Sequence, residues 1–381
     1  MEVDQWTWSP DEAWPAAPAL GREAQLVLAF GDRTLVDDPH RAEALQRLYP
    51  QAHVVGASAG GEITGDHVTD GTLSVTALAF RDTTPAVCKV ERRDGETDAA
   101  TGRRLGRGLA PLAPDGAPLR HVLVFADGLH LNGGAFVRGM EEALPDGVRL
   151  TGGLAADGDR FERTVLWSDG LLARPGAVAV GLYSRSLRVG YGAVGGWDPF
   201  GPDRLVTRSE GAVLHRLDDR GALDLYKEYL GPHAEQLPAS GLLFPLAIRT
   251  ADGPHEIVRT ALGTDEDAGT ITFAGDVPEG AYARFMKTNV ERIIDGALEA
   301  THRAVEQMGG AEAELVLLVS CVGRKWVLGQ RTEEEVEGVA AAFPQARLAG
   351  FYSYGEVAPV DRATHCELHN QTMTVTTLGE G

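Results

Sequence analysis

The stretch QARLAGFYSYGEVAP, residues 345–359, runs from a short apolar segment into a turn with two tyrosines, a serine and a glutamate. Before it come the apolar run AELVLLVSCVG (313–323) and the amphipathic segment EEEVEGVAAAFP (333–344). Two apolar runs on either side of an amphipathic helix are typical of a βαβ-like unit with a buried sheet. We therefore expect the quoted stretch to be the second strand of such a unit, ending in an acidic turn.

The same order of segments occurs in two earlier parts of the chain, residues 24–63 and residues 120–160. In each copy a proline stops the predicted helix, because proline disfavours helical geometry in the residue before it. A glycine follows six or seven residues later, where the second strand must turn or let another group approach closely. These residues are Pro50 and Gly56, Pro145 and Gly152, and Pro344 and Gly350.

The acidic turns after the three second strands are candidate ligand loops, because ligands bind at strand ends in open sheets. These turns carry Glu62, Asp159 and Glu356. If Glu62 and Glu356 faced one cleft, the pair would also suit acid–base catalysis.

The whole pattern predicts a mixed α/β (α+β) protein, with layered sheets covered by helices, pseudo-repeated β-α-β units in two lobes, and an antiparallel, β-rich middle. At 381 residues the chain exceeds the usual size of one hydrophobic core, which favours two lobes. We place the lobe boundary near Arg220. Helices are expected at 222–231 and 282–310, a mobile loop at 91–118, and a tail over residues 1–24.

The formal net charge of −20 is spread along the chain without a basic run, so nucleic acid and anionic membranes are poor partners. The amino terminus lacks the basic head and apolar core of a secretory signal, and no stretch is apolar for long enough to span a membrane. The three cysteines, Cys88, Cys321 and Cys366, form no CxxC pair. These features predict a cytoplasmic protein without membrane insertion.

One string points to an enzyme. GASAG (56–60) matches the G-x-S-x-G nucleophile motif, with Ser58 as the nucleophile. That motif requires a helix directly after the serine, whereas the following GEITGDHVTDGT (61–72) has no helical period. We therefore expect no enzyme, with a serine hydrolase as the alternative. The chain also lacks Walker-type and G-x-G-x-x-G glycine loops, so no nucleotide cofactor is indicated.

Three further features have a structural and a functional interpretation. In HCELHN (365–370), His365, Glu367 and His369 would share one strand face and suit a metal, although polar residues beside a sheet edge are the commoner explanation. Cys321 either packs at a strand end or acts as a reactive thiol. In GGWDPFGP (195–202), Trp197 and Phe200 either wall a ligand or plug the core.

Longer strings make the chain resemble the FIST-domain family from about residue 25 to its end. These strings are GASAGGEI, GGLAADGDRFERT, GGWDPFGPDRLVTRSEGAVL, ALDLYKEYLG, SCVGRKWVLGQRTEEEVEGV, GFYSYGEVAP and ELHNQTMTVTTL. The resemblance implies a FIST N-terminal domain at 25–220 and a FIST C-terminal domain at 221–381. It also implies a bacterial or archaeal cytoplasmic sensory module that binds a small ligand, such as an amino acid. Because no kinase or cyclase domain is attached, the output would pass through a separate partner, such as a histidine kinase.

A subset of this family binds haem and senses nitric oxide, which makes haem the alternative cofactor. The histidines of this chain include His53, His67, His215 and His369, and none has a context that marks an axial ligand. Gly195 stands where some relatives have histidine. We therefore expect no cofactor and no metal.

The predicted site binds a small polar ligand, amino acid or amine like, at the post-strand loops. Ser58 and Ser353 would offer hydroxyls, and Glu62 and Glu356 would hold an amino or guanidinium group. The remaining predicted contacts are the walls Tyr352, Tyr354 and Trp197, and Arg324 or Arg331 for a carboxylate. In the alternative, the two glutamates only accept hydrogen bonds from backbone amides of their own glycine turns and fix the geometry of the units.

Overall fold

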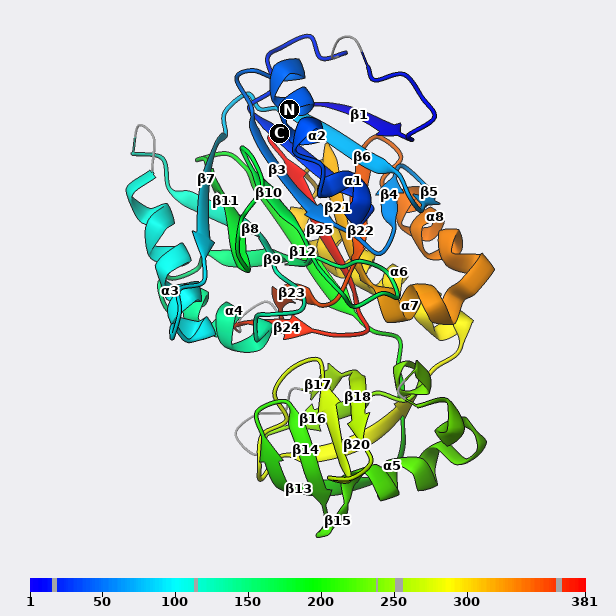
Figure 1. Cartoon of the computed structure of the whole chain (residues 1–381). Coiled ribbons are helices and arrows are strands. Elements are labelled where there is room, and N and C mark those ends of the chain that lie inside the picture. Colours follow the sequence, from blue (N-terminus) through cyan, green and yellow to red (C-terminus); the bar gives the residue numbers. More distant parts are fainter. Residues whose placement is uncertain (16–18, 113–115, 238, 251–255, 361–364) are drawn as a thin grey trace.

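The computed structural model describes residues 1–381 except 16–18, 113–115, 238, 251–255 and 361–364. Figure 1 shows a larger lobe, which holds both termini, and a smaller lobe that hangs from it. The larger lobe combines residues from the first half and from the last quarter of the chain. The smaller lobe is inserted between β12 and α6 of the larger one.

The larger lobe contains three sheets of similar construction. Sheet A has the strand order β1 (Glu2–Trp8), β6 (Leu73–Ala79), β2 (Leu26–Gly31), β3 (His53–Ser58), β10 (Leu166–Ser168). Sheet B has the order β12 (Arg188–Val194), β25 (Met373–Gly379), β21 (Leu315–Cys321), β22 (Arg347–Ser353), β4 (Glu62–Thr64), β5 (His67–Thr69). Sheet C has the order β24 (Cys366–His369), β23 (Glu356–Pro359), β9 (Arg149–Leu154), β8 (Leu119–Ala126), β11 (Gly176–Tyr183), β7 (Thr84–Glu91).

Each sheet is built around one of the expected strand–helix–strand segments. The pairs β2–β3, β8–β9 and β21–β22 are parallel, and every other pairing in these sheets is antiparallel. The glycine of each second strand lies opposite a residue of the first strand: Gly56 pairs with Ala29, Gly152 with Val124, and Gly350 with Leu318.

The strand that follows each parallel pair crosses to a neighbouring sheet. β4 leaves β3 and pairs with β22, β10 leaves the β9 segment and pairs with β3, and β23 leaves β22 and pairs with β9. The three sheets therefore exchange strands in a closed cycle. This exchange brings the loops at the carboxyl ends of neighbouring parallel pairs together.

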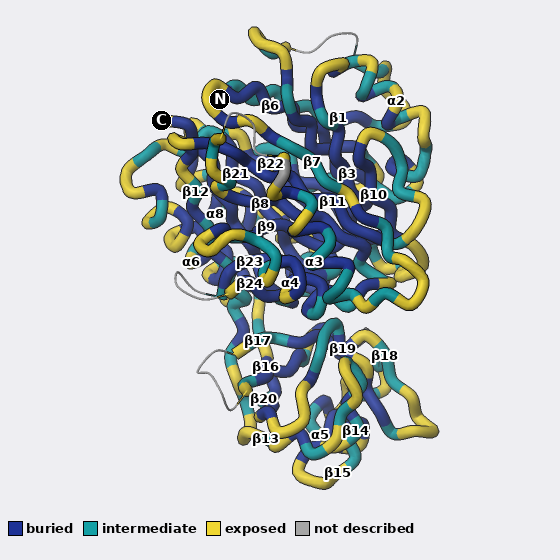
Figure 2. Tube along the Cα trace, turned by 90° about the vertical axis from the view of Figure 1, so that its left-hand side faces the viewer, coloured by how far each residue is buried: buried dark blue, intermediate teal, exposed yellow. Residues whose placement is uncertain are grey.

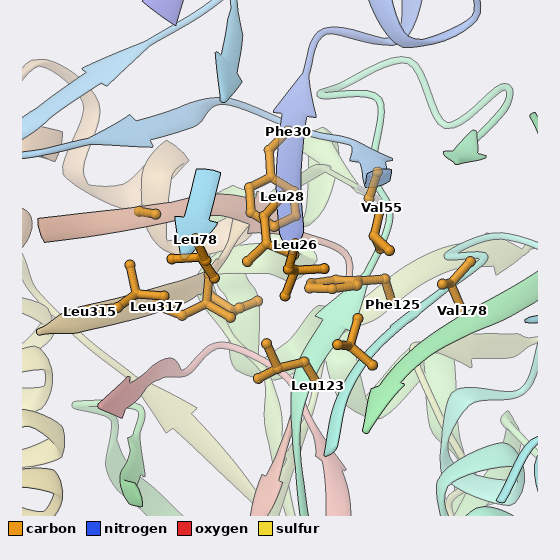
Figure 3. Close-up of a cluster of buried hydrophobic side chains, with 14 of the residues drawn as sticks. Leu26, Leu28, Phe30, Val55, Leu78, Leu123, Phe125, Val178, Leu315 and Leu317 are labelled. Atoms are coloured by element: carbon orange, nitrogen blue, oxygen red, sulfur yellow. The ribbon is translucent and has the colours of Figure 1, made fainter. Parts of the chain in front are cut away.

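The inner faces of the three sheets meet in one core. Figure 3 shows Leu26, Leu28 and Phe30 of β2 beside Phe125 of β8 and Leu317 of β21. The Phe30 and Phe351 rings stack with centroids 4.5 Å apart. Figure 2 shows that buried backbone runs through the strands of this lobe, with exposed segments at its periphery. Apolar residues on both strand faces make the runs of the parallel strands nearly continuous, as expected for sheets covered on both sides.

Helices cover the outer faces of the sheets. Among the described residues, the helices and short 3₁₀ turns of this lobe are α1 (Arg33–Val36), α2 (Pro39–Leu48), α3 (Asp98–Leu109), η1 (Ala110–Leu112), α4 (Gly133–Glu141), α6 (Val290–Met308), α7 (Val322–Leu328), η5 (Gly329–Arg331) and α8 (Thr332–Ala342). α2 packs on sheet A, α3 and α4 on sheet C, and α6 and α8 on sheet B. Among the described residues, no helix is both long and apolar enough to cross a lipid bilayer.

The described part of the smaller lobe forms an antiparallel sheet of eight strands with its own core, so the expected β-rich, antiparallel middle of the chain is confirmed. Its elements are β13 (Asp198–Glu210), β14 (Val213–Leu217), β15 (Arg220–Gly221), α5 (Ala222–Leu230), η3 (Gly231–Gln236), η4 (Ala239–Leu243), β16 (Leu246–Arg249), β17 (Glu256–Arg259), β18 (Ala261–Asp265), β19 (Thr270–Phe273) and β20 (Tyr282–Lys287).

Four expectations about single segments are wrong. Residues 2–8 of the expected tail form β1, which pairs with β6. The expected mobile loop contains α3 at 98–109, whose apolar side packs on α4. Residues 282–287 of the expected helix form β20, and the helix begins only at Val290. Arg220 lies in β15 inside the smaller lobe, so it does not mark the boundary between the lobes.

Candidate functional site

A cleft of about 250 Å³ lies between the two lobes. The larger lobe contributes the loops at the carboxyl ends of its parallel strands, and the smaller lobe contributes the edge around β18 and β19. The lining residues are Gly128, Leu129, Leu131, Asn132, Gly133, Leu154, Phe161, Cys321, Val322, Gly323, Ser353, Tyr354 and Leu368 from the larger lobe, with Ala212, Leu242, Thr260, Leu262, Thr272, Phe273, Ala274 and Gly275 from the smaller one.

Most of this lining is apolar, and none of these described residues is charged. Tyr354 and Phe161 form one wall, with their rings stacked 4.6 Å apart and almost parallel. The Tyr354 hydroxyl donates to the Asp157 carboxylate, which holds the ring in place. The cleft therefore suits a small molecule with a largely apolar body.

The loop after β8 is shaped by Asp127. Its Oδ1 accepts hydrogen bonds from the backbone amides of Leu129 at 2.9 Å and His130 at 2.6 Å. This turn leads to Asn132, whose side chain caps α4 by accepting from the Ala135 amide at 2.9 Å. The aspartate turn and the cap thus place residues 128–133 at the cleft.

Cys321 in the third unit is equivalent to Asp32 in the first and Asp127 in the second. Each lies three residues after the first-strand residue that pairs with the glycine of the second strand. Asp32 caps α1 through its side chain, whereas α7 begins after Cys321 without a side-chain cap. Burial raises the pKa of the Cys321 thiol to about 12. The thiol is therefore protonated at neutral pH, which favours a packing role over a nucleophile.

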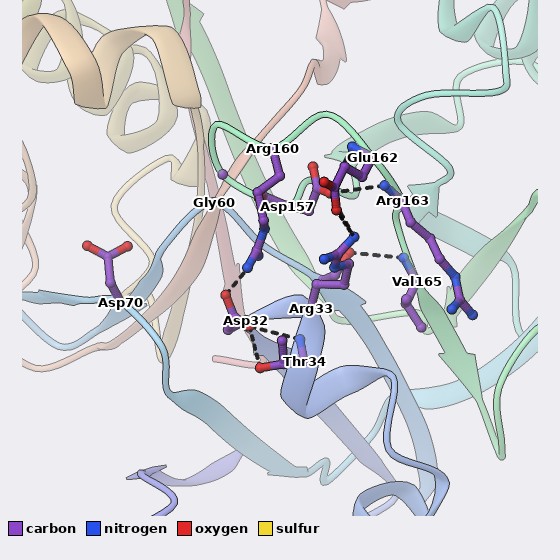
Figure 4. Close-up of polar contacts among 12 residues, drawn as sticks. Asp32, Arg33, Thr34, Gly60, Asp70, Asp157, Arg160, Glu162, Arg163 and Val165 are labelled. Atoms are coloured by element: carbon purple, nitrogen blue, oxygen red, sulfur yellow. Dashed lines mark hydrogen bonds and ion pairs between the residues drawn. The ribbon is translucent and has the colours of Figure 1, made fainter.

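The two other junctions between parallel pairs are filled by polar contacts. Figure 4 shows Arg160 paired with Asp32 at 2.9 Å and Arg33 paired with Glu162 at 3.0 Å at the junction of the first and second units. At the junction of the third and first units, Lys325 donates to the Gly60 carbonyl at 2.9 Å and pairs with Asp70. The cleft lies at the remaining junction, which the smaller lobe covers.

Glu62 and Glu356 occupy matching positions on the crossing strands but do not line the cleft. Each is buried, and each accepts from the amide and the hydroxyl of a threonine in a later turn. The Glu62 bonds come from Thr72 at 3.3 and 2.8 Å, and the Glu356 bonds from Thr372 at 3.1 and 2.8 Å. The amides belong to the Thr72 and Thr372 turns and not, as in the expected alternative, to the glutamates' own glycine turns.

Burial raises the pKa of both Glu62 and Glu356 to about 8, against the lowering effect of these hydrogen bonds. Asp159, the acidic residue expected in the second unit, is exposed. Glu62 pairs with β22 and Glu356 pairs with β9. At the equivalent position of the second unit, the residue that pairs with β3 is Leu166. The three acidic turns are therefore not equivalent.

Arg324 and Tyr352 belong to a buried polar network. Arg324 pairs with Glu335 at 2.7 Å, and the Tyr352 hydroxyl donates to the same carboxylate at 2.8 Å. Arg324 also donates to the carbonyls of Gly195 and Ile293. Its guanidinium is fully buried and used within the protein, so it does not face a ligand in the cleft.

The two serines differ. Ser58 is buried, and its Oγ accepts from the Val165 amide at 3.0 Å. β4 follows it in place of a helix, so the nucleophile motif lacks the required context. Ser353 lines the cleft and donates to Glu356 at 2.7 Å.

The last two predicted contacts also lie outside the cleft. Arg331 lies on the surface and pairs with Glu291 at 2.8 Å and Glu334 at 2.6 Å. Trp197 donates to the Gln371 carbonyl at 2.9 Å and packs on Met286 at the base of the smaller lobe. Of the nine predicted residues, the structure brings Ser353 and Tyr354 together in the cleft.

The HCELHN segment forms β24 at the edge of sheet C. His365 and Glu367 pair at 3.1 Å, and His369 lies 3.1 Å from the Ala358 carbonyl. Burial lowers the pKa of His369 to about 4, so the imidazole is neutral. Within the described part of the chain, no group of three histidine, cysteine, aspartate or glutamate side chains is arranged to hold a metal ion.

The described lining of the cleft does not favour haem. No histidine is among its described lining residues, and burial favours the protonated form of Cys321 and Tyr354. His53 instead pairs with Asp169, and His215 lies beside Glu210. The described lining of the cleft thus offers no histidine as an axial ligand.

Two family models match the chain: the FIST N domain over residues 25–220 and the FIST C domain over residues 222–359. The uncharacterized protein Rv0628c of Mycobacterium tuberculosis (strain ATCC 25618 / H37Rv) is 24% identical over 372 residues, which is 93% of this chain and 91% of that protein. The uncharacterized protein MJ1623 of Methanocaldococcus jannaschii is 23% identical over 81% of this chain and 62% of its own length.

Among solved structures, a crystal structure of chorismatase aligns over 99% of both chains, with 15% identity and a TM-score of 0.37. FIST domains are associated with sensory signal transduction. Because the two family models together span most of its length, the chain belongs to the FIST family.

Proposed function

We propose that the chain is a sensory module that binds a small molecule in the cleft between its lobes and signals through a separate partner protein, such as a histidine kinase. The observation that carries the proposal is the position of the cleft. It lies at the carboxyl ends of two parallel strand pairs, the usual ligand site of such sheets, and beneath an inserted lobe.

The lining defines the chemistry of the proposed ligand. An amino acid or amine, the ligand expected from the family resemblance, would need a charged partner, and the described lining residues offer none. The polar groups of the lining are the hydroxyls of Ser353, Tyr354, Thr260 and Thr272, the Asn132 amide and the Cys321 thiol, and none of them is charged at neutral pH. We therefore favour a small, uncharged and largely apolar molecule with one or two hydrogen-bonding groups.

A thermal-shift screen tests this proposal. The panel holds small neutral apolar compounds, amino acids, amines and haemin, and the visible spectrum is recorded with haemin. A ligand present at 100 times its Kd stabilises the native state by about 2.7 kcal/mol, so its shift is measurable. We expect a shift with a member of the neutral group.

A variant that fills the cleft locates the binding. Thr272 is exposed on β19 and lines the cleft, so Thr272→Trp adds bulk there without entering the core. Leu205→Trp is the matched control, since Leu205 is 37% exposed on the same sheet and is not a lining residue. The shift should vanish in Thr272→Trp and persist in Leu205→Trp. A shift that survives Thr272→Trp, or the lack of any stabilising compound, would contradict the proposal.

A further inference from the structure

The chain passes between the lobes at two adjacent points. It enters the smaller lobe at Gly195–Trp197 and leaves it at Thr288–Asn289. The Thr288 hydroxyl donates to the Gly196 carbonyl at 2.8 Å, which ties the two crossings together. Gly196 has a φ of +77°, and a Cβ there would lie 2.0 Å from the Arg292 carbonyl oxygen, so glycine is required. Two adjacent single-chain crossings have the geometry of a hinge.

Arg324 of the larger lobe bonds to the chain just before it enters the smaller lobe and again shortly after it returns, at the first turn of α6. One guanidinium nitrogen donates to the Gly195 carbonyl before the smaller lobe, and another donates to the Ile293 carbonyl after it at 2.9 Å. Glu335 fixes the guanidinium at 2.7 Å. Arg324 lies on α7, and Val322 and Gly323 at the start of that helix line the cleft. A single short helix therefore contacts both the cleft and the hinge.

A polar contact closes the lobes at Asp276 of the smaller lobe. Asp276 accepts from the side-chain Nδ2 of Asn132 at 2.7 Å and pairs with Arg138 at 3.1 Å, both from the α4 region. Arg259 adds a hydrogen bond from the smaller lobe to the Leu368 carbonyl at 2.9 Å. Asn132 and Leu368 line the cleft, so these contacts must part if the lobes separate there.

We propose that the smaller lobe is a hinged lid on the cleft, held at its hinge by Arg324 and latched to α4 by Asp276. The inference rests on the proposed function in that the lid encloses the ligand site. A ligand in the cleft would shift the amino-terminal residues of α7. The helix would move with them and displace Arg324 at the hinge. Ligand binding would then be signalled to the partner protein as a change in the orientation of the smaller lobe.

The test is the distance between the lobes in the full-length chain, measured by pulsed electron paramagnetic resonance. Nitroxide labels are attached at Asp94→Cys on the larger lobe and Glu210→Cys on the smaller one, whose native side chains are 96% and 71% exposed. The background is Cys88→Ser, since Cys321 and Cys366 are buried. We expect Asp276→Ala to widen the distance distribution or shift it by more than about 2 Å.

Asp203→Ala is the matched control, because Asp203 pairs with Arg249 at 2.9 Å and with Arg284 at 2.7 Å, and both arginines belong to the smaller lobe. It should leave the distribution unchanged. Arg324→Met should widen the distance distribution as well, although this variant leaves the buried Glu335 without its cationic partner and can prevent folding. Arg292→Ala then tests the hinge, since Arg292 on α6 pairs with Asp198 on β13 at 2.8 Å.

Distributions of Asp276→Ala and Arg292→Ala that superimpose on the parent would overturn the lid. Because this measurement uses no ligand, it is independent of the screen. A chain that binds no compound but opens in Asp276→Ala would refute the proposed function and support the lid.

Discussion

At the scale of single residues, the buried glutamates determine how stability depends on pH. Glu62 and Glu356 have a pKa of about 8 in the folded protein, against 4.5 for a free glutamate. A carboxyl with a raised folded pKa contributes stability that is fully present below the unfolded pKa and is lost as pH rises through the folded one. The stability of this protein should therefore fall between about pH 5 and about pH 8, by up to about 1.4 kcal/mol per pH unit for each glutamate.

The variant Glu356→Gln tests this at one residue. The amide mimics the protonated carboxyl, since its oxygen can accept from Thr372 and its nitrogen can donate to the Ser353 hydroxyl, which is the donor to the Glu356 carboxylate in the parent. The decline in the free energy of unfolding from pH 5 to pH 8, measured by urea denaturation, should be smaller than in the parent. Glu43→Gln, at a side chain 61% exposed, should retain the full decline. Equal destabilisation by Glu356→Gln at every pH would show that the folded carboxyl is ionised.

At the scale of elements, α3 and α4 cross through glycines. A Cβ at Gly139 of α4 would lie 2.0 Å from the Ala99 carbonyl oxygen of α3, and one at Gly102 would lie 2.1 Å from the Phe136 carbonyl oxygen. Gly139→Ala must push the helices apart and should cost about 1–3 kcal/mol by chemical denaturation. The control is Gly134→Ala on the same helix, where the nearest atom is 3.4 Å away and alanine favours the helix by about 0.5–1 kcal/mol. Similar free energies for the two variants would contradict this close crossing.

The same helices show what the sequence can and cannot predict about elements. The apolar strands and the helices of the three units follow from their periodicity and their stop signals, because burial and backbone geometry act locally there. The sequence of α3, DAATGRRLGRGL, predicts a loop, since it is rich in glycine and arginine. Gly102 and Gly106 serve the crossing with α4, a tertiary contact that no local pattern reveals. β1 was missed for the same reason, since its partner β6 lies some 70 residues later.

At the scale of the whole molecule, the site itself was only partly predictable. Ser353 and Tyr354 follow from the rule that strand ends carry ligand sites. The same rule could have found the loop after β8, which begins within RHVLVFADG. The residues around β18 and β19 face the cleft because the inserted lobe folds back over one strand junction. The charges of Glu62 and Arg324 favour ligand contacts when the sequence is taken alone. In the structure both side chains are buried, and they bond to Thr72 and Glu335 within the protein.

The inserted lobe should be separable from the rest of the protein. Its core contains residues from Val206 to Phe285, whereas the four main clusters of the larger lobe contain none from 198–287. The two crossings are already joined by the bond from Thr288 to Gly196, so a short glycine–serine linker can replace residues 198–287 without strain. We expect the shortened chain to unfold cooperatively in a thermal melt followed by circular dichroism, and to lose any stabilisation by a cleft ligand. The excised lobe should give its own transition. A shortened chain that binds a hydrophobic dye and shows no cooperative melt would mean that the larger lobe depends on the lid for its fold, and that the smaller lobe is part of one folding unit with it.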